Sequence, residues 1–228
     1  MDKKTETNAL PRHLLEWLAA SRTRFLNDLK DGKPLRYFAA HLPVVSTWTK
    51  GGADPFPVNM TVKGIGLIPR KALIQGWTET FDGVLAEGKG LPPPAWEASL
   101  ARRVDAINAL YGDIDNFDPT VMGGLEIFEG TAFKNLSENP CASLLYTGME
   151  HGPEGLKYIS FQVNGTVSIL GKDDPYYAYL LAARRLFEFD KFHLFQPDYP
   201  FGYLIKVVEA KDKSPWSRPA HGGGKPHP

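Results

Sequence analysis

Two apolar extended segments, separated by one short polar helix, constrain this chain more than any other feature of its sequence. Residues 124–146 read GLEIFEGTAFKNLSENPCASLLY. Apolar residues dominate GLEIFE and CASLLY, whereas TAFKNLSE has the spacing of a short helix. Gly130-Thr131 opens this helix, and Asn139-Pro140 closes it because proline cannot continue a helix. The pattern predicts two strands clipped together by one short helix.

Four more segments have the composition of β-strands: residues 42–50, 57–68, 156–170 and 201–210. The first two are separated by the Gly-rich turn GGADPF and so predict a hairpin. Apolar residues at helical spacing predict a helix over residues 11–31. A second helix is predicted from Asp173 to about Phe189, with DDP as its capped start.

Residues 69–119 interrupt this series of strands. Two helical segments, RKALIQGWTETFDGVLAEG and PAWEASLARRVDAINALYG, are separated by the prolines of KGLPPP. Because each has an apolar face to bury, we interpret them as a helical insertion. Six strands with few parallel crossovers favour a mostly antiparallel sheet, which often closes into a small barrel. All 228 residues are assigned to one domain, in which residues 211–228 form an extended C-terminal tail.

Composition excludes several classes of partner. The 26 basic residues equal the 26 acidic ones, whereas proteins that bind nucleic acid or anionic membranes usually have a marked basic excess. No long apolar run and no signal peptide occur, so we expect a cytoplasmic protein. Cys141 is the single cysteine and is interpreted as a buried thiol. The histidines lack HxH or HExxH spacing, so no metal site is predicted.

The order of these segments resembles the FMN-binding split-barrel fold of the pyridoxamine 5'-phosphate oxidase-like superfamily. The matching pieces, which cover roughly two thirds of the chain, are LPVVSTWTKGGADPFPVNMTVK, GLEIFEGTAFKNLSENPCASLLY and YISFQVNGTVSIL with the helix after it. The resemblance implies an α+β fold: a mostly antiparallel, six-stranded split β-barrel with flanking helices and the insertion between strands 2 and 3.

A phosphate site is the first consequence of the resemblance. A flavin phosphate is a dianion, and a helix start supplies N–H groups for it. By position, Lys63, Thr131 and Lys134 would bind this phosphate. The family's helix cation usually follows the hydroxyl by two residues, where this chain has Phe133. Without a ligand, Thr131 is a helix N-cap, Lys134 a solvated lysine and Lys63 an edge-strand lysine.

The ring of the flavin would lie along the second strand and the strand before Asn164-Gly165. This position implies contacts with Asn59, Met60, Ser160 and Gln162, although the family usually has a basic residue near position 59. Proteins of this family are typically homodimers with the cofactor at the subunit junction. Trp216 and Arg218 in the tail would then cover the cofactor of the partner subunit.

The resemblance implies an FMN-dependent oxidoreductase that acts on a small molecule as a homodimer. No general acid or base is identified, so the chemistry would be that of the cofactor. The alternative is a non-catalytic split barrel with a degenerate flavin site that binds haem or another ligand, or that acts as a partner subunit. His221 and His227 are the tail residues that could ligate a haem or metal. A lipocalin-like barrel without cofactor is a third possibility.

Overall fold

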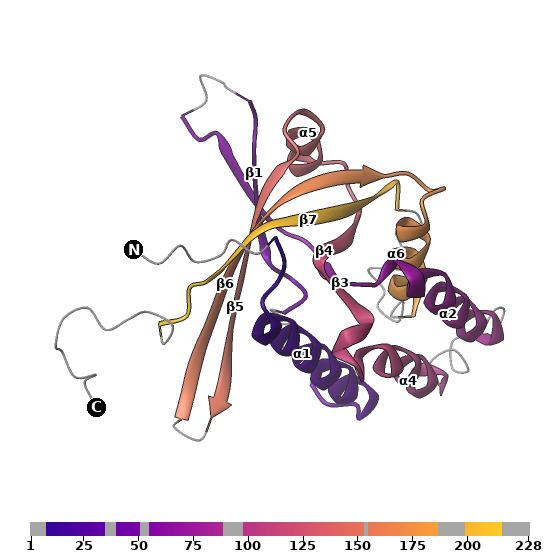
Figure 1. The fold of residues 1–228 in the computed structure, drawn as a ribbon. Coiled ribbons are helices and arrows are strands. Elements are labelled where there is room, and N and C mark those ends of the chain that lie inside the picture. Colours follow the sequence, from indigo (N-terminus) through magenta and orange to yellow (C-terminus); the bar gives the residue numbers. More distant parts are fainter. Residues whose placement is uncertain are drawn as a thin grey trace.

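The computed structural model describes residues 8–34, 40–50, 55–88, 98–152, 155–186 and 199–215, and Figure 1 shows its fold. One antiparallel sheet contains seven strands in the order β2-β1-β5-β6-β7-β4-β3. These strands are β1 Val44–Trp48, β2 Val58–Val62, β3 Ile65–Pro69, β4 Phe117–Glu126, β5 Cys141–Gly152, β6 Gly155–Leu170 and β7 Phe201–Asp212.

The described helices are α1 Arg12–Lys30, α2 Ile74–Gly88, α4 Leu100–Tyr111, α5 Thr131–Glu138 and α6 Pro175–Arg185, with short 3-10 turns at Lys71–Leu73 and Ile114–Asn116. Figure 1 shows α1, α2, α4 and α6 together on one side, while α5 lies apart, close to β1. In this group α2 packs against α4 and α6, and α1 against α4. The part of the insertion that the structure describes is therefore mainly helical, as predicted. Among the described helices, none is both long and apolar enough to span a bilayer.

The predicted count of six strands is wrong, because residues 57–68 form two strands. β2 pairs with β1, as the predicted hairpin requires, but β3 pairs with β4. β-propensity is continuous across Lys63-Gly64, whereas the pairing partner changes there. Local composition indicates that a segment will form a strand, but it does not indicate which other strand it will pair with.

The connection between β2 and β3 shapes the whole sheet. These strands lie at opposite edges, yet only Lys63 and Gly64 separate them in the chain. A flat seven-stranded sheet would measure roughly 29 Å between its edges, since neighbouring strands lie about 4.8 Å apart. The chain from Val62 to Ile65 spans at most about 11 Å. The sheet must therefore curl until its edges meet at Lys63-Gly64, which we call the seam. Such closure is consistent with the predicted split barrel.

Alternation along the strands divides the sheet into two faces. Val45 and Thr47 of β1, Leu144 of β5 and Val163 of β6 are buried and form part of the core. Their neighbours in sequence point away from the core, to what we call the outer face. Trp17 of α1 covers the core side of the β5–β6 hairpin, where it contacts the site of Gly148 and packs near Phe161.

Close packing at the seam gives a first prediction. A Cβ on Gly124 of β4 would overlap the carbonyl oxygen of Gly64. We expect Gly124→Ala to lower the free energy of unfolding by at least about 2 kcal/mol, because neither backbone can move without opening the sheet. Gly171→Ala is the matched control, since its added Cβ meets open space. Urea unfolding of both variants measures the difference, and equal midpoints would show that the seam is loosely packed.

Candidate functional site

Two asparagines fix α5 against the sheet. The side-chain amide of Asn135 donates to Thr47 Oγ1 at 3.2 Å, and that of Asn139 donates to the carbonyl of Trp48 at 3.1 Å. Asn139 Oδ1 also accepts from the N–H of Cys141 at 3.3 Å. The Asn139-Pro140 pair thus ends the helix, anchors it to β1 and starts β5. The predicted arrangement, two strands connected by one short helix, is present, and side-chain hydrogen bonds of two asparagines hold the helix against the sheet.

The residues predicted to bind the flavin lie on both faces of the sheet. In β2, Met60 pairs with Ser46 and lies on the outer face, whereas Asn59 pairs with the buried Thr47. Directly paired residues share a face, and neighbours in a strand do not. We therefore distinguish an outer group, Met60, Ser160 and Gln162, from an α5 group, Asn59, Lys63, Thr131 and Lys134.

Three members of the α5 group are available to a ligand. Thr131 and Lys134 are exposed, and Asn59 is half-buried. Their side chains make no hydrogen bond or ion pair with the residues that the structure describes. Gly130, not Thr131, occupies the N-cap, and no side chain caps this helix end. Thr131 therefore is the first residue of the helix, and its hydroxyl is not used as a cap.

Lys63, the fourth member of the α5 group, is held in a buried ion pair at the seam. Its Nζ lies 2.6 Å from Glu126 Oε2, and the Tyr203 hydroxyl donates to the same oxygen. Only 14% of the Lys63 side chain and 2% of that of Glu126 are exposed. Lys63 is thus already neutralised by a carboxylate. The sequence pattern did not identify Glu126 as a site residue, because it lies in a segment predicted only to form a strand.

The protonation states of this cluster follow from its hydrogen bonds. Burial raises the pKa of Glu126, but hydrogen bonds from Lys63, Tyr203 and the N–H of Phe128 outweigh burial and leave the pKa below its usual value. Burial, and then the hydrogen bond to Glu126, raises the pKa of Tyr203. At neutral pH Glu126 is therefore ionised and Tyr203 carries its proton.

The outer face combines an apolar half with a polar half. One row of paired residues consists of Met60, Ser46, Ser143, Asn164 and Glu209, and the next of Val62, Val44, Leu145, Gln162 and Lys211. Each row begins with exposed apolar side chains at β2 and ends with a charge at β7. This gradient suits a flat ligand that is apolar at one end and hydrogen-bonding at the other.

Hydrogen bonds hold the polar half in place. Ser143 donates to Asn164 Oδ1 at 2.8 Å, and Gln162 Nε2 lies 3.1 and 3.0 Å from these two oxygens. Asn164 in turn donates to Glu209 at 2.9 Å. An ion-paired hydrogen bond from Lys211, at 2.7 Å, is the main cause of the lowered pKa of Glu209. Ser143, Asn164 and Glu209 were not nominated from sequence, because only the register reveals their alignment.

The interpretation of Cys141 as a buried thiol is wrong. Cys141 is exposed, because Ala142 and Leu144 take the buried positions of β5 and alternation sends Cys141 outward. No group of three or more His, Cys, Asp or Glu residues in the described ranges is arranged to hold a metal ion. Trp216, Arg218, His221 and His227 lie outside the described residues.

His41 packs behind the seam, with its Nε2 3.3 Å from the position of a Cβ on Gly64. Desolvation lowers the pKa of His41 well below its usual value, and the positive charges of Arg22 and Arg184 lower it further. His41 is therefore neutral at neutral pH. The cavity between His41, Arg22 and Tyr111 measures about 10 Å³, which is room for one water molecule.

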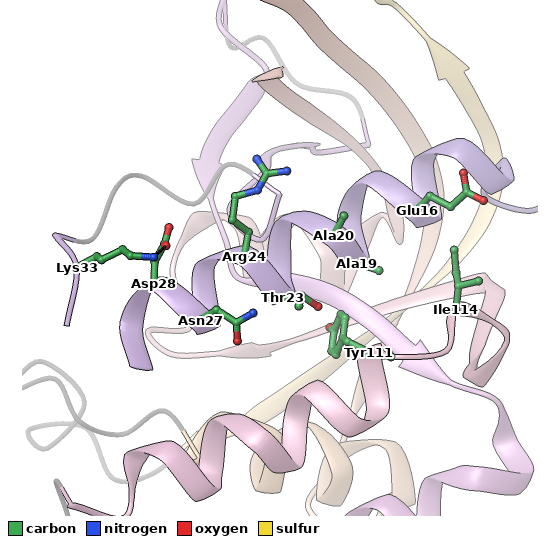
Figure 2. Close-up of a pocket in the computed structure, with 11 residues that line it drawn as sticks. Glu16, Ala19, Ala20, Thr23, Arg24, Asn27, Asp28, Lys33, Tyr111 and Ile114 are labelled. Atoms are coloured by element: carbon green, nitrogen blue, oxygen red, sulfur yellow. Dashed lines mark hydrogen bonds and ion pairs between the residues drawn. The ribbon is translucent and has the colours of Figure 1, made fainter. Parts of the chain in front are cut away.

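A larger hollow lies elsewhere, between α1 and the C-terminal end of α4. This groove of about 750 Å³ is lined mainly by α1, and Figure 2 shows its side chains. Glu16 and Lys33 line it, but each is already ion-paired, with Arg12 and Asp28 respectively. Among the predicted site residues that the structure describes, none lines the groove, so it provides no support for the predicted cofactor site.

Comparisons with known proteins give matches among solved structures alone. No protein-family model and no curated protein matches this sequence. Solved structures do match: an FMN-binding protein from Syntrophomonas wolfei is 11% identical, with 89% of this chain and 93% of that chain covered and a TM-score of 0.43. A candidate pyridoxamine 5'-phosphate oxidase from Lactobacillus delbrueckii is 14% identical, with 92% and 99% covered and a TM-score of 0.39.

HutZ, the haem storage protein from Vibrio cholerae, also matches, with 9% identity, 75% of this chain and 85% of that chain covered, and a TM-score of 0.38. The matching structures thus include an FMN-binding protein and an oxidase-like protein, the kinds of protein that the sequence resembles. Identities of 9–14% and these TM-scores tell nothing of activity.

The ion pair at the seam gives a second prediction. Lys63→Met leaves the Glu126 carboxylate buried without its cation, and we expect the free energy of unfolding to fall by about 3 kcal/mol. Adding Glu126→Gln removes the buried charge and should recover much of this loss. Urea unfolding of the two single variants and the double variant measures the coupling. Additive effects would mean that the pair contributes nothing beyond its separate side chains.

The pH dependence of stability tests the same pair. Because the pKa of Glu126 is lowered in the folded state, its stabilisation is complete above the ordinary glutamate pKa of about 4.3 and is lost as pH falls through the folded value. In Lys63→Met, loss of the cation raises the folded-state pKa of Glu126 toward or above its unfolded value, so the acid loss of stability due to this group should shrink or reverse. Unfolding midpoints across the acid range provide the measurement, and superimposable profiles would contradict the assignment.

Proposed function

We propose that this chain binds FMN and acts as an FMN-dependent oxidoreductase on a small molecule. The supporting observation is the pairing of an amphipathic outer face with three members of the α5 group, Thr131, Asn59 and Lys134, whose side chains make no hydrogen bond or ion pair to the described residues. Bound FMN would supply the electron-transfer chemistry. The protein's part is to bind the ring and phosphate and to keep them oriented.

The outer face fits the isoalloxazine ring. The dimethylbenzene end of this ring is apolar and its pyrimidine end has hydrogen-bonding groups. Met60 and Val62 provide an exposed apolar surface, and Gln162 lies farther along the same row as Val62. Ser160 lies two residues before Gln162 and shares its face, with a hydroxyl that makes no hydrogen bond to the described residues.

The α5 group fits the phosphate in part. The first N–H groups of α5 have no side-chain cap, and the Thr131 hydroxyl and Lys134 ammonium are exposed beside them. Helix starts favour anions. Lys63 does not contribute, because Glu126 neutralises it. We therefore assign the phosphate to Thr131, Lys134 and Asn59.

A homodimer would bring the two parts of the site together. Seven of the ten exposed large apolar side chains among the described residues lie on the outer face: Val58, Met60, Val62, Leu145, Met149, Leu156 and Tyr158. An apolar surface of this extent is typical of a protein interface. We propose that a second copy covers it, with each cofactor between the outer face of one chain and the α5 group of the other.

Ligand affinity tests the phosphate assignment. We expect Thr131→Val combined with Lys134→Met to weaken FMN binding by at least about tenfold, since one charge-assisted hydrogen bond contributes about 1.5–3 kcal/mol. Riboflavin has the same ring without phosphate, and its affinity should not change. Fluorescence quenching measures both ligands. Lys71→Met, which removes an exposed lysine of the insertion, is the control, and equal losses for both ligands would disprove the assignment.

Oligomeric state tests the interface. Met60 is 69% exposed on an edge strand, so Met60→Glu should fold as well as the wild type. Buried in a dimer, the new carboxylate would have no partner and should weaken association by about tenfold or more. Ala72→Glu changes an exposed residue of the insertion, away from the outer face, and should have no effect. Light scattering across a dilution series distinguishes these results, and a monomeric wild type would end the proposal.

One observation favours a second candidate, a split barrel that has lost flavin and binds haem or serves as a partner subunit. The ion pair of Lys63 with Glu126 removes a cation from the phosphate site. The visible spectrum of protein purified without added cofactor separates the two candidates. Flavin bands support the oxidoreductase, a Soret band supports haem, and a colourless protein that takes up neither supports the partner role.

A further inference from the structure

Three successive backbone N–H groups between β4 and α5 converge on one carboxylate oxygen. Glu126 Oε1 accepts from Ile127 at 3.0 Å, Phe128 at 2.9 Å and Glu129 at 3.1 Å. Glu129 has a positive φ of 46°, which is uncommon for a residue other than glycine. Successive N–H groups that point into one concavity form a nest, a recognised type of anion-binding site.

The second oxygen of the same carboxylate is held from the opposite side. Glu126 Oε2 receives the hydrogen bonds of Lys63 and Tyr203, and both donors come from other strands or the seam. Five donors thus surround one carboxylate, of which only 2% is exposed. Here the Glu126 oxygens stand where oxygens of a free carboxylate or a phosphate would otherwise be bound.

We infer that residues 127–129, Lys63 and Tyr203 form an oxyanion-binding site, and that Glu126 closes this site to ligands by filling it from within the chain. A tethered carboxylate competes at a high effective concentration, so a free anion cannot displace it. The geometry also makes Glu126 a determinant of ligand choice. Because Glu126 occupies the N–H groups of residues 127–129 and the Lys63 ammonium, a phosphate cannot use these donors, which would otherwise bind it most strongly.

Chemical rescue tests the oxyanion site. In Glu126→Ala the five donors lose their anion, and formate is small enough to replace it. The unfolding temperature of this variant should rise with formate by at least about 3 °C more than that of the wild type, with sodium chloride at equal ionic strength as reference. Comparison with the wild type in each salt removes general salt effects. Lys63→Met in the Ala background should abolish most of the rescue.

The outcomes are distinct even if the alanine variant folds poorly. A chain that is unfolded in chloride but folded in formate or phosphate supports the site. A chain that gains no more from formate or phosphate than the wild type overturns it. The same holds for a chain that stays unfolded in every salt while the near-isosteric Glu126→Gln folds. None of these measurements requires a flavin.

A flavin measurement extends the inference and rests on the proposed function. The affinity ratio of FMN to riboflavin should rise at least about tenfold in Glu126→Ala, because the phosphate gains the donors that Glu126 released. An unchanged ratio with tight binding of both flavins would overturn the role of Glu126 in ligand choice. Rescue by formate without binding of either flavin would disprove the proposed function and leave the oxyanion site supported.

Discussion

The two-residue connection between β2 and β3 is the constraint on which the rest of this structure depends. Because these strands lie at opposite edges of the sheet, Lys63-Gly64 can join them only if the sheet closes on itself. Closure brings the end of β4 against the seam, where Gly124 contacts Gly64 and Glu126 meets Lys63. The loop that leads into α5 starts at the same place. The local geometry of the candidate site is thus a consequence of how the sheet closes.

Closure also brings a buried lysine and several backbone N–H donors together at the seam, and a carboxylate of the same chain neutralises the charge and accepts their hydrogen bonds. Lys63 is largely buried, and the N–H groups of residues 127–129 point at the same buried position. Buried donors without acceptors are costly. The Glu126 carboxylate satisfies them together. A phosphate could do the same in a protein that always carries its cofactor. A chain with its own carboxylate at this point can close its sheet without any ligand.

Much of this fold could be predicted from the sequence, because the decisive signals are local. The short helix, its end at Asn139-Pro140, the helical insertion and the first hairpin were all predicted and are present. The pairing partner of a strand has no local signal, so the sequence predicts one strand over residues 57–68 where the structure has two. Alternation alone would have placed Asn59 and Met60 on opposite faces. The role of Glu126 had no local signal, since its five donors come from three separate parts of the chain.

The division of the nominated residues between two faces limits how one chain can use them. A flavin that lies flat on the outer face of β1, β5 and β6 cannot reach α5 through its own sheet, because the core side of β1 packs against that helix. It can reach an α5 group only around the edge strand β2 or from another molecule. The exposed side chains of β2, which include Met60, extend the apolar surface up to that edge. An interface there would bury this surface and complete the site in one step, so assembly and cofactor binding should depend on each other.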